Sequence, residues 1–288
     1  MNHLTRFIIN ELNIRGQIIQ LSSEWQQLLA PHHYPASLAS LLGELTSATL
    51  MLASGLKIEG KLLAQIQSQG PVPLLVSEAQ LQQKKALDHP ILLRAYAHQT
   101  DQDTSSQPLH GQPFMEAARL TFTIWNDQER YQSVTSADYA SLNQALEAYF
   151  LQSEQATTFV RLFADPKHAC GLFLQHIPDQ PLADDDWSYA SELANTISFA
   201  ELSAMEPLVI LHRLFHELDI QVYDAQPIQW NHAVNRASME QAIRAIPSDE
   251  LTELLAQQNQ QLHIKCEFTG QTIIFSAQDI AQLRQHET

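Results

Sequence analysis

The chain has 288 residues, of which 44% are apolar, and a formal net charge of −16 at pH 7. The apolar fraction supports a packed core, whereas the negative charge argues against partners that are themselves anionic, namely nucleic acids and membrane surfaces. With only two cysteines, no apolar run approaching the roughly 20 residues that span a bilayer, and no signal peptide, the sequence predicts a cytoplasmic protein.

The N-terminal segment predicts a pair of strands followed by a short helix. Apolar residues on both sides of Asn13 indicate two strands within residues 4–21, and Gly16 is expected to interrupt the second strand. Either Ser22 or Ser23 is expected to cap the short helix, because a serine hydroxyl accepts hydrogen bonds from free N–H groups at a helix start.

A longer helix and a series of strands come next. Leucines recur at helical spacing from about Ala36, and Gly55 is a suitable residue for ending this helix. Asp138 is expected to cap a second helix that runs to Phe150, and the polar stretch 98–113 predicts a surface loop. Further strands are predicted at 58–66, 73–76, 91–96, 120–124, 130–134, 157–163 and 171–177.

The last third of the chain is more helical. Aspartates at 184–186 precede a helix, where they fit a cap that complements the helix dipole better than a cation site. From 231 onward the pattern predicts two helices, a hairpin and a last helix capped by Ser276 and Asp279. The expected protein is therefore α+β, with an N-terminal mixed α/β-sheet domain (1–178), a helical linker (179–230) and a small C-terminal α/β module (231–288).

Short strings spread over nearly the whole chain carry a resemblance to a known family. They include Leu41-Leu42-Gly43-Glu44-Leu45, Leu56-Lys57-Ile58-Glu59-Gly60, Gln69-Gly70-Pro71-Val72, Leu146-Glu147-Ala148-Tyr149-Phe150 and Arg213-Leu214-Phe215-His216-Glu217. By their order and coverage, the chain resembles the bacterial redox-regulated 33 kDa heat-shock chaperones. The resemblance implies an ATP-independent holdase that binds unfolded proteins, prevents their aggregation and acts as a homodimer.

The resemblance also implies a zinc switch, and the sequence departs from the family there. In reduced members four cysteines of the C-terminal module hold zinc, and oxidation forms two disulfides, expels the metal and unfolds the linker. By position, the residues that stand at the four cysteine positions in this chain are His232, Val234, Cys266 and Thr269. One thiolate cannot form a disulfide within the site, valine cannot bind zinc, and threonine is a poor ligand. We therefore expect no cofactor and a metal-free folded module.

Two chemical alternatives involve Cys266. It forms a residual zinc site if His232 and His263 face it, or a disulfide if it meets Cys170. The simpler interpretation is that both thiols are small buried side chains, because a reducing cytosol disfavours disulfides.

The apolar stripes of the linker are the candidate surface for clients or for a dimer partner. Apolar helical faces usually pack against a core or another subunit, and in this family the same face can serve unfolded proteins in turn. The candidate residues are Trp187, Leu193, Ile197, Phe199, Leu202, Leu208 and Leu211.

The leading hypothesis is a holdase without the thiol–zinc switch. The alternative is a binding or structural module that kept the fold but lost general holdase activity. An enzyme is not expected, because the chain has no G-x-S-x-G, P-loop or H-E-x-x-H pattern.

Overall fold

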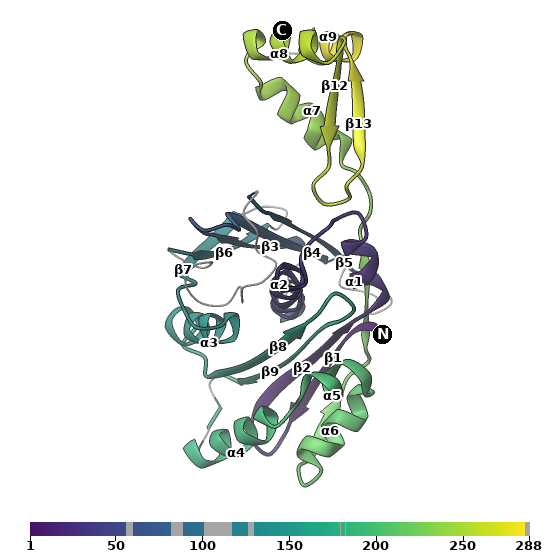
Figure 1. Cartoon of the computed structure of the whole chain (residues 1–288). Coiled ribbons are helices and arrows are strands. Elements are labelled where there is room, and N and C mark those ends of the chain that lie inside the picture. Colours follow the sequence, from purple (N-terminus) through teal and green to yellow (C-terminus); the bar gives the residue numbers. More distant parts are fainter. Residues whose placement is uncertain are drawn as a thin grey trace. The chain divides into compact units, whose positions relative to one another are not determined.

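The computed structural model describes residues 1–55, 60–81, 89–100, 117–125, 130–178, 180–181 and 183–285. Its contacts divide the chain into two compact units, Met1–Asn231 and His232–Thr288 (Figure 1). Within the described parts, the first unit combines an eleven-stranded sheet with helices, and the second combines a two-stranded sheet with helices. The predicted α+β class is confirmed. The predicted loop at 98–113 lies almost wholly outside the described residues.

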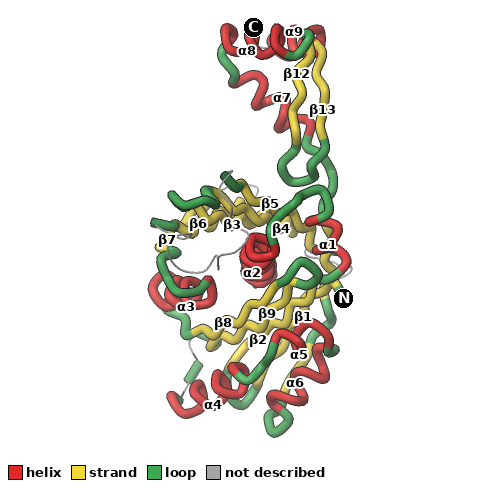
Figure 2. Tube along the Cα trace, in the orientation of Figure 1, coloured by secondary structure: helices red, strands yellow, loops and turns green. Residues whose placement is uncertain are grey.

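The large sheet has two antiparallel halves joined by one strand (Figure 2). One half contains, in spatial order, β8 (Thr158–Ala164), β9 (Ala169–His176), β2 (Ile14–Leu21) and β1 (Asn2–Ile9), with β10 (Ile220–Val222) also paired to β1. The other half contains β5 (Ile91–His98), β4 (Leu74–Leu81), β3 (Gly60–Gln67), β6 (Arg119–Trp125) and β7 (Arg130–Ser136). The joining strand, β11 (Gln226–Trp230), runs antiparallel to β1 and parallel to β5.

Helix α2 (Ala36–Gly55) lies between the two halves of the sheet and forms the centre of the first core (Figure 1). It packs against β3 and β4 on one side and against β8 and β9 on the other. By length and mean hydropathy this helix could cross a bilayer, although serine, threonine, glycine and Glu44 interrupt its apolar residues. However, 72% of its apolar window is buried inside the protein, as in the core helix of a globular domain.

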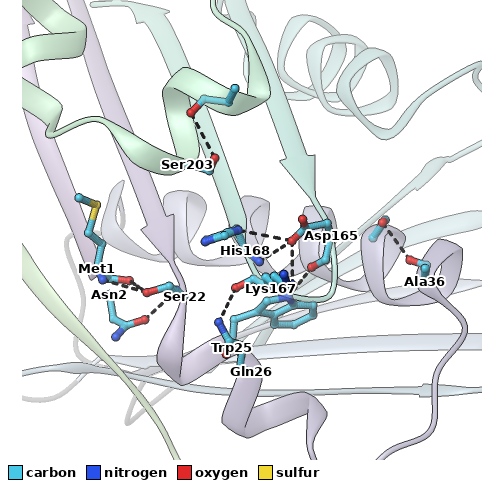
Figure 3. A network of polar contacts seen from close by, with 12 residues as sticks. Met1, Asn2, Ser22, Trp25, Gln26, Ala36, Asp165, Lys167, His168 and Ser203 are labelled. Carbon is cyan, nitrogen blue, oxygen red and sulfur yellow. Dashed lines mark hydrogen bonds and ion pairs between the residues drawn. The ribbon is translucent and has the colours of Figure 1, made fainter.

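The predicted N-terminal strand pair is confirmed, but the cap of the following helix differs from the prediction. Helix α1 (Ser23–Leu29) begins after Ser22, whose hydroxyl makes no capping bond. Instead, Asn2 Oδ1 accepts hydrogen bonds from the backbone N–H groups of Ser22 (2.9 Å) and Glu24 (3.2 Å). The Ser22 hydroxyl accepts a bond from the Met1 ammonium and donates one to the Met1 carbonyl, both 2.8 Å (Figure 3). The Asn2 side chain thus replaces a local cap.

The turn between β8 and β9 is fastened to α1 (Figure 3). Trp25 Nε1 donates to the Asp165 carbonyl (2.9 Å), and Gln26 Nε2 donates to the Lys167 carbonyl (3.1 Å). The Asp165 carboxylate closes the turn by accepting from the backbone N–H groups of Lys167 (2.7 Å) and His168 (2.6 Å). These bonds fix the end of the β8–β9 hairpin on the N-terminal segment.

Helix α3 (Leu142–Ser153) begins three residues later than the Asp138 cap predicted. Its N-cap is Ser141, whose hydroxyl accepts a hydrogen bond from Gln144 N (3.3 Å). The prediction failed because residues 139–141 form a bend before the helix starts. Asp138 and Ser141 both have side chains suited to capping, so composition alone does not choose between them.

Two side chains of α3 cover the free edge of β8. Asn143 Oδ1 accepts a hydrogen bond from Leu162 N (3.1 Å), and Glu147 Oε1 accepts one from Val160 N (2.9 Å). These two N–H groups point away from β9, so without α3 they would form an open strand edge that invites pairing with another chain. The helix thereby protects one end of the large sheet.

We expect Glu147→Gln to make the unfolding free energy less dependent on pH. Burial raises the pKa of the Glu147 carboxyl more than the bond from Val160 N lowers it. A carboxyl with a higher pKa in the folded state than its unfolded value of about 4.3 binds its proton more tightly when folded. Native stability therefore falls as the pH rises through that window, and glutamine, which keeps the Oε1 acceptor, avoids this loss.

Urea unfolding at about pH 4 and about pH 7 measures this effect. The unfolding free energy of the glutamine variant should exceed that of the native chain by a small amount at the lower pH and by a larger amount at the higher pH. An advantage that is independent of pH would contradict the assignment.

The segment 179–230 contains the predicted helices and two strands that were not predicted. Its helices are α4 (Asp184–Asn195), α5 (Phe199–Ala204) and α6 (Pro207–Phe215), and the three aspartates lie in the first turn of α4. The segment then returns to the sheet as β10 and β11. These strands have three and five residues, too short to show a clear alternation in the sequence.

The second unit contains the elements that were predicted for it. They are α7 (Arg236–Ala245), α8 (Ser248–Gln257), β12 (Gln261–Lys265), β13 (Thr272–Ser276) and α9 (Ala277–Gln285). The predicted capping box of α9 is confirmed, since Asp279 N donates to Ser276 Oγ (3.2 Å) and Ser276 N donates to Asp279 Oδ2 (2.8 Å). The core of this unit is apolar and includes Met239, Ile243, Leu251, Leu262, Cys266, Phe275 and Ile280.

Candidate functional site

The linker helices pack on the face of β1, β2 and β9 opposite to α2 (Figure 1). Of the seven candidate surface residues, Ile197, Leu202 and Leu211 are buried in this second core, and Trp187, Leu193 and Phe199 pack against it partly buried. Leu208 differs, because 64% of it is exposed. The neighbouring Val209 and, on α4, Tyr189 are also exposed. The structure therefore brings most of the stripe together, but against the protein's own sheet.

Gly16 allows the linker helices to approach the sheet closely. Contrary to the prediction, it does not interrupt β2, which continues through it in register with Phe7 of β1. The Phe7 ring lies over the space where a Gly16 side chain would be, and its centroid is 6.3 Å from that of Phe215 on α6. The ring thus connects the sheet to the linker.

Gln20 is the main polar anchor of the linker on the sheet. Its side chain is only 2% exposed, and Nε2 donates to the carbonyls of Leu202 and Met205, both at 2.7 Å. These carbonyls lie at the end of α5, where no intrahelical donor follows. Both amide hydrogens of one side chain therefore hold the α5–α6 junction.

We expect Gln20→Leu to destabilise the docked linker by about 1–3 kcal/mol, because it leaves two carbonyls without their donor in an apolar interface. Limited proteolysis within 196–216 and urea unfolding measure the change. The matched control is Gln26→Leu, which removes an exposed amide with one carbonyl partner and should change stability by less than about 0.5 kcal/mol. Equal effects of the two variants would show that Gln20 is not a specific anchor.

The turn after β12 contains Cys266 and Thr269 and is closed by its own hydrogen bonds. Cys266 N donates to the Gln271 carbonyl (2.8 Å), and the Cys266 carbonyl accepts from Thr269 N (3.2 Å) and Gly270 N (2.8 Å). Thr269 Oγ1 accepts a bond from Gln271 N (3.3 Å). Cys266 and Thr269 are 9% and 4% exposed. The hydroxyl therefore organises the backbone of the turn.

The residues at the four implied ligand positions do not fit a zinc ion. Val234 has no donor atom and packs against the core of the module, and Thr269 uses its oxygen within the turn. His263 is exposed on β12, opposite the half-exposed Ile274, whereas Cys266 is buried. In the described part of the chain, no group of three or more His, Cys, Asp or Glu residues is arranged to hold a metal ion.

Comparison with known proteins places the chain among relatives. The family model described as Hsp33 protein matches residues 2–276. The chain belongs to the Hsp33 family. A protein of Shewanella loihica named 33 kDa chaperonin is 34% identical over 281 residues, which cover 97% of this chain and 94% of that protein. A 33 kDa chaperonin of Pseudomonas syringae pv. syringae is 34% identical over 284 residues, which cover 96% and 92%.

The fold is also that of a solved Hsp33 structure. The crystal structure of the 33 kDa chaperonin from Thermotoga maritima matches with a TM-score of 0.79 over 100% of this chain and 99% of that one. The identity is 16%, so this match supports the fold alone. The resemblance inferred from the sequence strings is confirmed.

The thiols of this Hsp33-family chain are free in the structure. Cys170 lies in the core between the sheet and the linker helices, and Cys266 lies in the core of the second unit. Burial is the largest cause that raises the pKa of the Cys170 thiol, followed by the charges of Asp165 and Glu44. A thiol with a raised pKa remains protonated and reacts slowly with oxidants.

Gln20 and Gly16 are functional candidates of the Hsp33 fold that sequence reasoning missed. The signal for Gln20 is an amide in a strand whose other residues on the same face, Ile14 and Ile18, are apolar and pack against the linker. An amide on such a face needs a partner, since burying it unpaired is costly. The signal for Gly16 is a glycine inside a strand, which often marks a place where another group packs closely on the backbone.

Proposed function

We propose that this Hsp33-family chain is a non-enzymatic, ATP-independent holdase of the cytoplasm that works without the thiol–zinc switch that the family resemblance implies. Family membership and the names of the relatives support chaperone activity. The observation that carries the loss of the switch is the turn at Cys266, which closes through backbone bonds and the Thr269 hydroxyl in a module with its own apolar core. A separate cofactor is not part of the proposal.

The proposed client surface is the linker together with the sheet face beneath it. Leu208 and Val209 on α6 are exposed and available for a first contact. The remaining stripe becomes available when α4–α6 leave β1, β2 and β9, because those residues now pack on that face. In this proposal residues 179–230 act as a releasable linker, and the active form is a homodimer, which light scattering tests by a mass twice that of one chain.

Suppression of the thermal aggregation of a model enzyme tests the proposal. The assay compares untreated, peroxide-treated and chelator-treated protein, and includes Cys266→Ser, whose side chain is close in size to cysteine. We expect similar suppression in all four samples, because the turn does not depend on metal or on a disulfide. Activity that appears only after oxidation, or that the serine variant lacks, would refute the loss of the switch.

The alternative function is a binding or structural module that serves one partner. The specific observation in its favour is that most of the linker stripe is covered. Absence of aggregation suppression under every condition, including temperatures at which α4–α6 become sensitive to protease, would favour this alternative over the holdase.

A further inference from the structure

A cavity lies inside the first unit, between the two halves of the sheet. Water-sized molecules can occupy about 180 Å³ of it. Residues from β2, β3, β6 and β9 line it together with the ends of α2 and α3. This is less than the roughly 300–1,000 Å³ of most ligand sites, but an engineered cavity of about 150 Å³ is enough to bind benzene, so the space suits the apolar part of a small organic molecule.

Most of the lining is apolar or aromatic. The rings of Phe122, Tyr149, Phe150 and Phe173 form a continuous series, with centroids 4.9 to 5.5 Å apart between successive members. Met51 and Leu62 extend this wall from α2 and β3. Such a wall binds the hydrocarbon or aromatic body of a ligand through burial of its apolar surface.

The remaining wall is a row of polar side chains on adjacent strands. Arg15 and Gln17 of β2 and Gln175 of β9 lie on the face that elsewhere carries core residues such as Ile19 and Phe173. Each of the three is oriented by a hydrogen bond. Gln175 Oε1 accepts from Arg15 Nε (3.0 Å) and Nη2, and Gln17 Oε1 accepts from Ser54 Oγ (2.9 Å). Gln17 and Gln175 are buried, where apolar side chains would pack without needing partners, whereas Arg15 is exposed.

Arg15 provides a positive charge that no carboxylate neutralises directly. Its two hydrogen bonds go to a neutral amide, and no ion pair within 4.0 Å joins it to an acidic side chain in the parts of the chain that the structure describes. Glu154 also lines the cavity, and burial lowers the pKa of Arg15 more than the charge of Glu154 raises it; Glu154 Oε1 itself accepts from the Tyr149 hydroxyl (3.5 Å). A guanidinium held by a neutral partner retains N–H donors for an anion.

We propose that this cavity binds a small amphipathic carboxylate, with the apolar body against the aromatic wall and the carboxylate on Arg15. A fatty acid of medium chain length and an aromatic carboxylic acid share this chemistry. The proposal concerns the first unit only and does not depend on the holdase activity, so either can fail without the other.

Binding of sodium decanoate to the full chain, measured by calorimetry, tests the head group. Decanol and decylamine have the same chain with a neutral and a positive head, and phenylbutyrate represents the aromatic source. We expect saturable binding of one decanoate, with decanol weaker by roughly 10-fold or more, because a charge-assisted hydrogen bond is lost. Tighter binding of decylamine than of decanoate would overturn the assignment to Arg15.

Two variants and one control locate the ligand. Arg15→Gln should lower the affinity for decanoate to that for decanol, whereas Arg119→Gln, which removes an exposed arginine of β6 that does not line the cavity, should leave it unchanged. Gly55→Leu should abolish the binding of decanoate and of decanol, because Gly55 lines the cavity. The substitution should not clash with the protein, since an added Cβ would meet nothing within 4 Å.

The native chain labelled at its methionine methyl groups gives a direct readout that requires no substitution. Decanoate should shift the Met51 methyl resonance in a saturable way and leave that of Met239, in the second unit, unchanged. Absence of saturable binding would overturn the proposal. So would binding that does not shift the Met51 methyl resonance and whose affinity is unchanged by Arg15→Gln.

Discussion

Gly16→Ala is expected to loosen the packing of the linker helices on the sheet while leaving the core around α2 intact. A Cβ atom at residue 16 would lie 2.1 Å from Phe7 Cζ and 2.5 Å from both Phe7 Cε atoms. The ring is buried and contacts Phe215, so it cannot move away without displacing α6. Overpacking of this kind costs about 1–3 kcal/mol, and here the strain falls on the interface with the linker.

Hydrogen exchange and the binding of a hydrophobic dye measure this effect. Amides of α5 and α6 should exchange faster and the dye should bind more, while the amides of α2 remain protected. Gly55→Ala is the matched control, because its Cβ meets nothing within 4 Å and should leave both measurements unchanged. If Gly16→Ala leaves α6 as protected as in the native chain, Phe7 does not connect the sheet to the linker.

Phe275→Ala is expected to unfold the second unit and leave the first unit folded. Phe275 is fully buried at the centre of the small core, and the Arg236 guanidinium lies 4.9 Å from its ring centroid. Removing a buried phenylalanine costs about 3–5 kcal/mol, which is comparable to the whole stability that so small a core supplies. The loss of unfolding free energy should be large because, in the proposed metal-free module, no bound ion compensates for it.

Backbone amide spectra of the full chain show the two units separately. Resonances of α7–α9 should collapse to unfolded positions in Phe275→Ala, and those of the first unit should remain. Ile274→Ala is the control on the same strand, since that side chain is 50% exposed and its loss should have little effect. If zinc restores the folded spectrum of Phe275→Ala, the module has a metal site after all.

Much of the fold follows from periodicity. The leucine spacing of α2 and the apolar alternation in β3 and β6 predict these elements because apolar residues recur with the period of a helix or of a strand, although α2 is buried nearly all round and the middle of β6 on both faces. Strand β11 escapes prediction because five residues show little periodicity, and its place in the sheet depends on pairing with β1 and β5. Long-range pairing of this kind is set by the tertiary structure and has little local signal.

The sequence predicts which residue types stand at the candidate site, but not which side chains and helices contact one another there. The missing cysteines identify a changed module directly from residue types at Val234 and Thr269. The roles of Gln20 and Gly16 depend on which element covers each face of β2, and that information lies in the linker, far along the chain. A buried amide or a glycine within a strand marks such a position without naming its partner.

The return of the chain through β10 and β11 determines how quickly the linker can dock again. The segment carrying α4–α6 is attached to the sheet at both ends, since β9 ends at His176 and β10 begins at Ile220. Helices that leave the sheet therefore stay within a closed loop, where their effective concentration near the vacated face is about millimolar. In the proposed holdase, redocking is then a first-order process whose rate is independent of protein concentration, and a bound client would compete with a segment that never diffuses away.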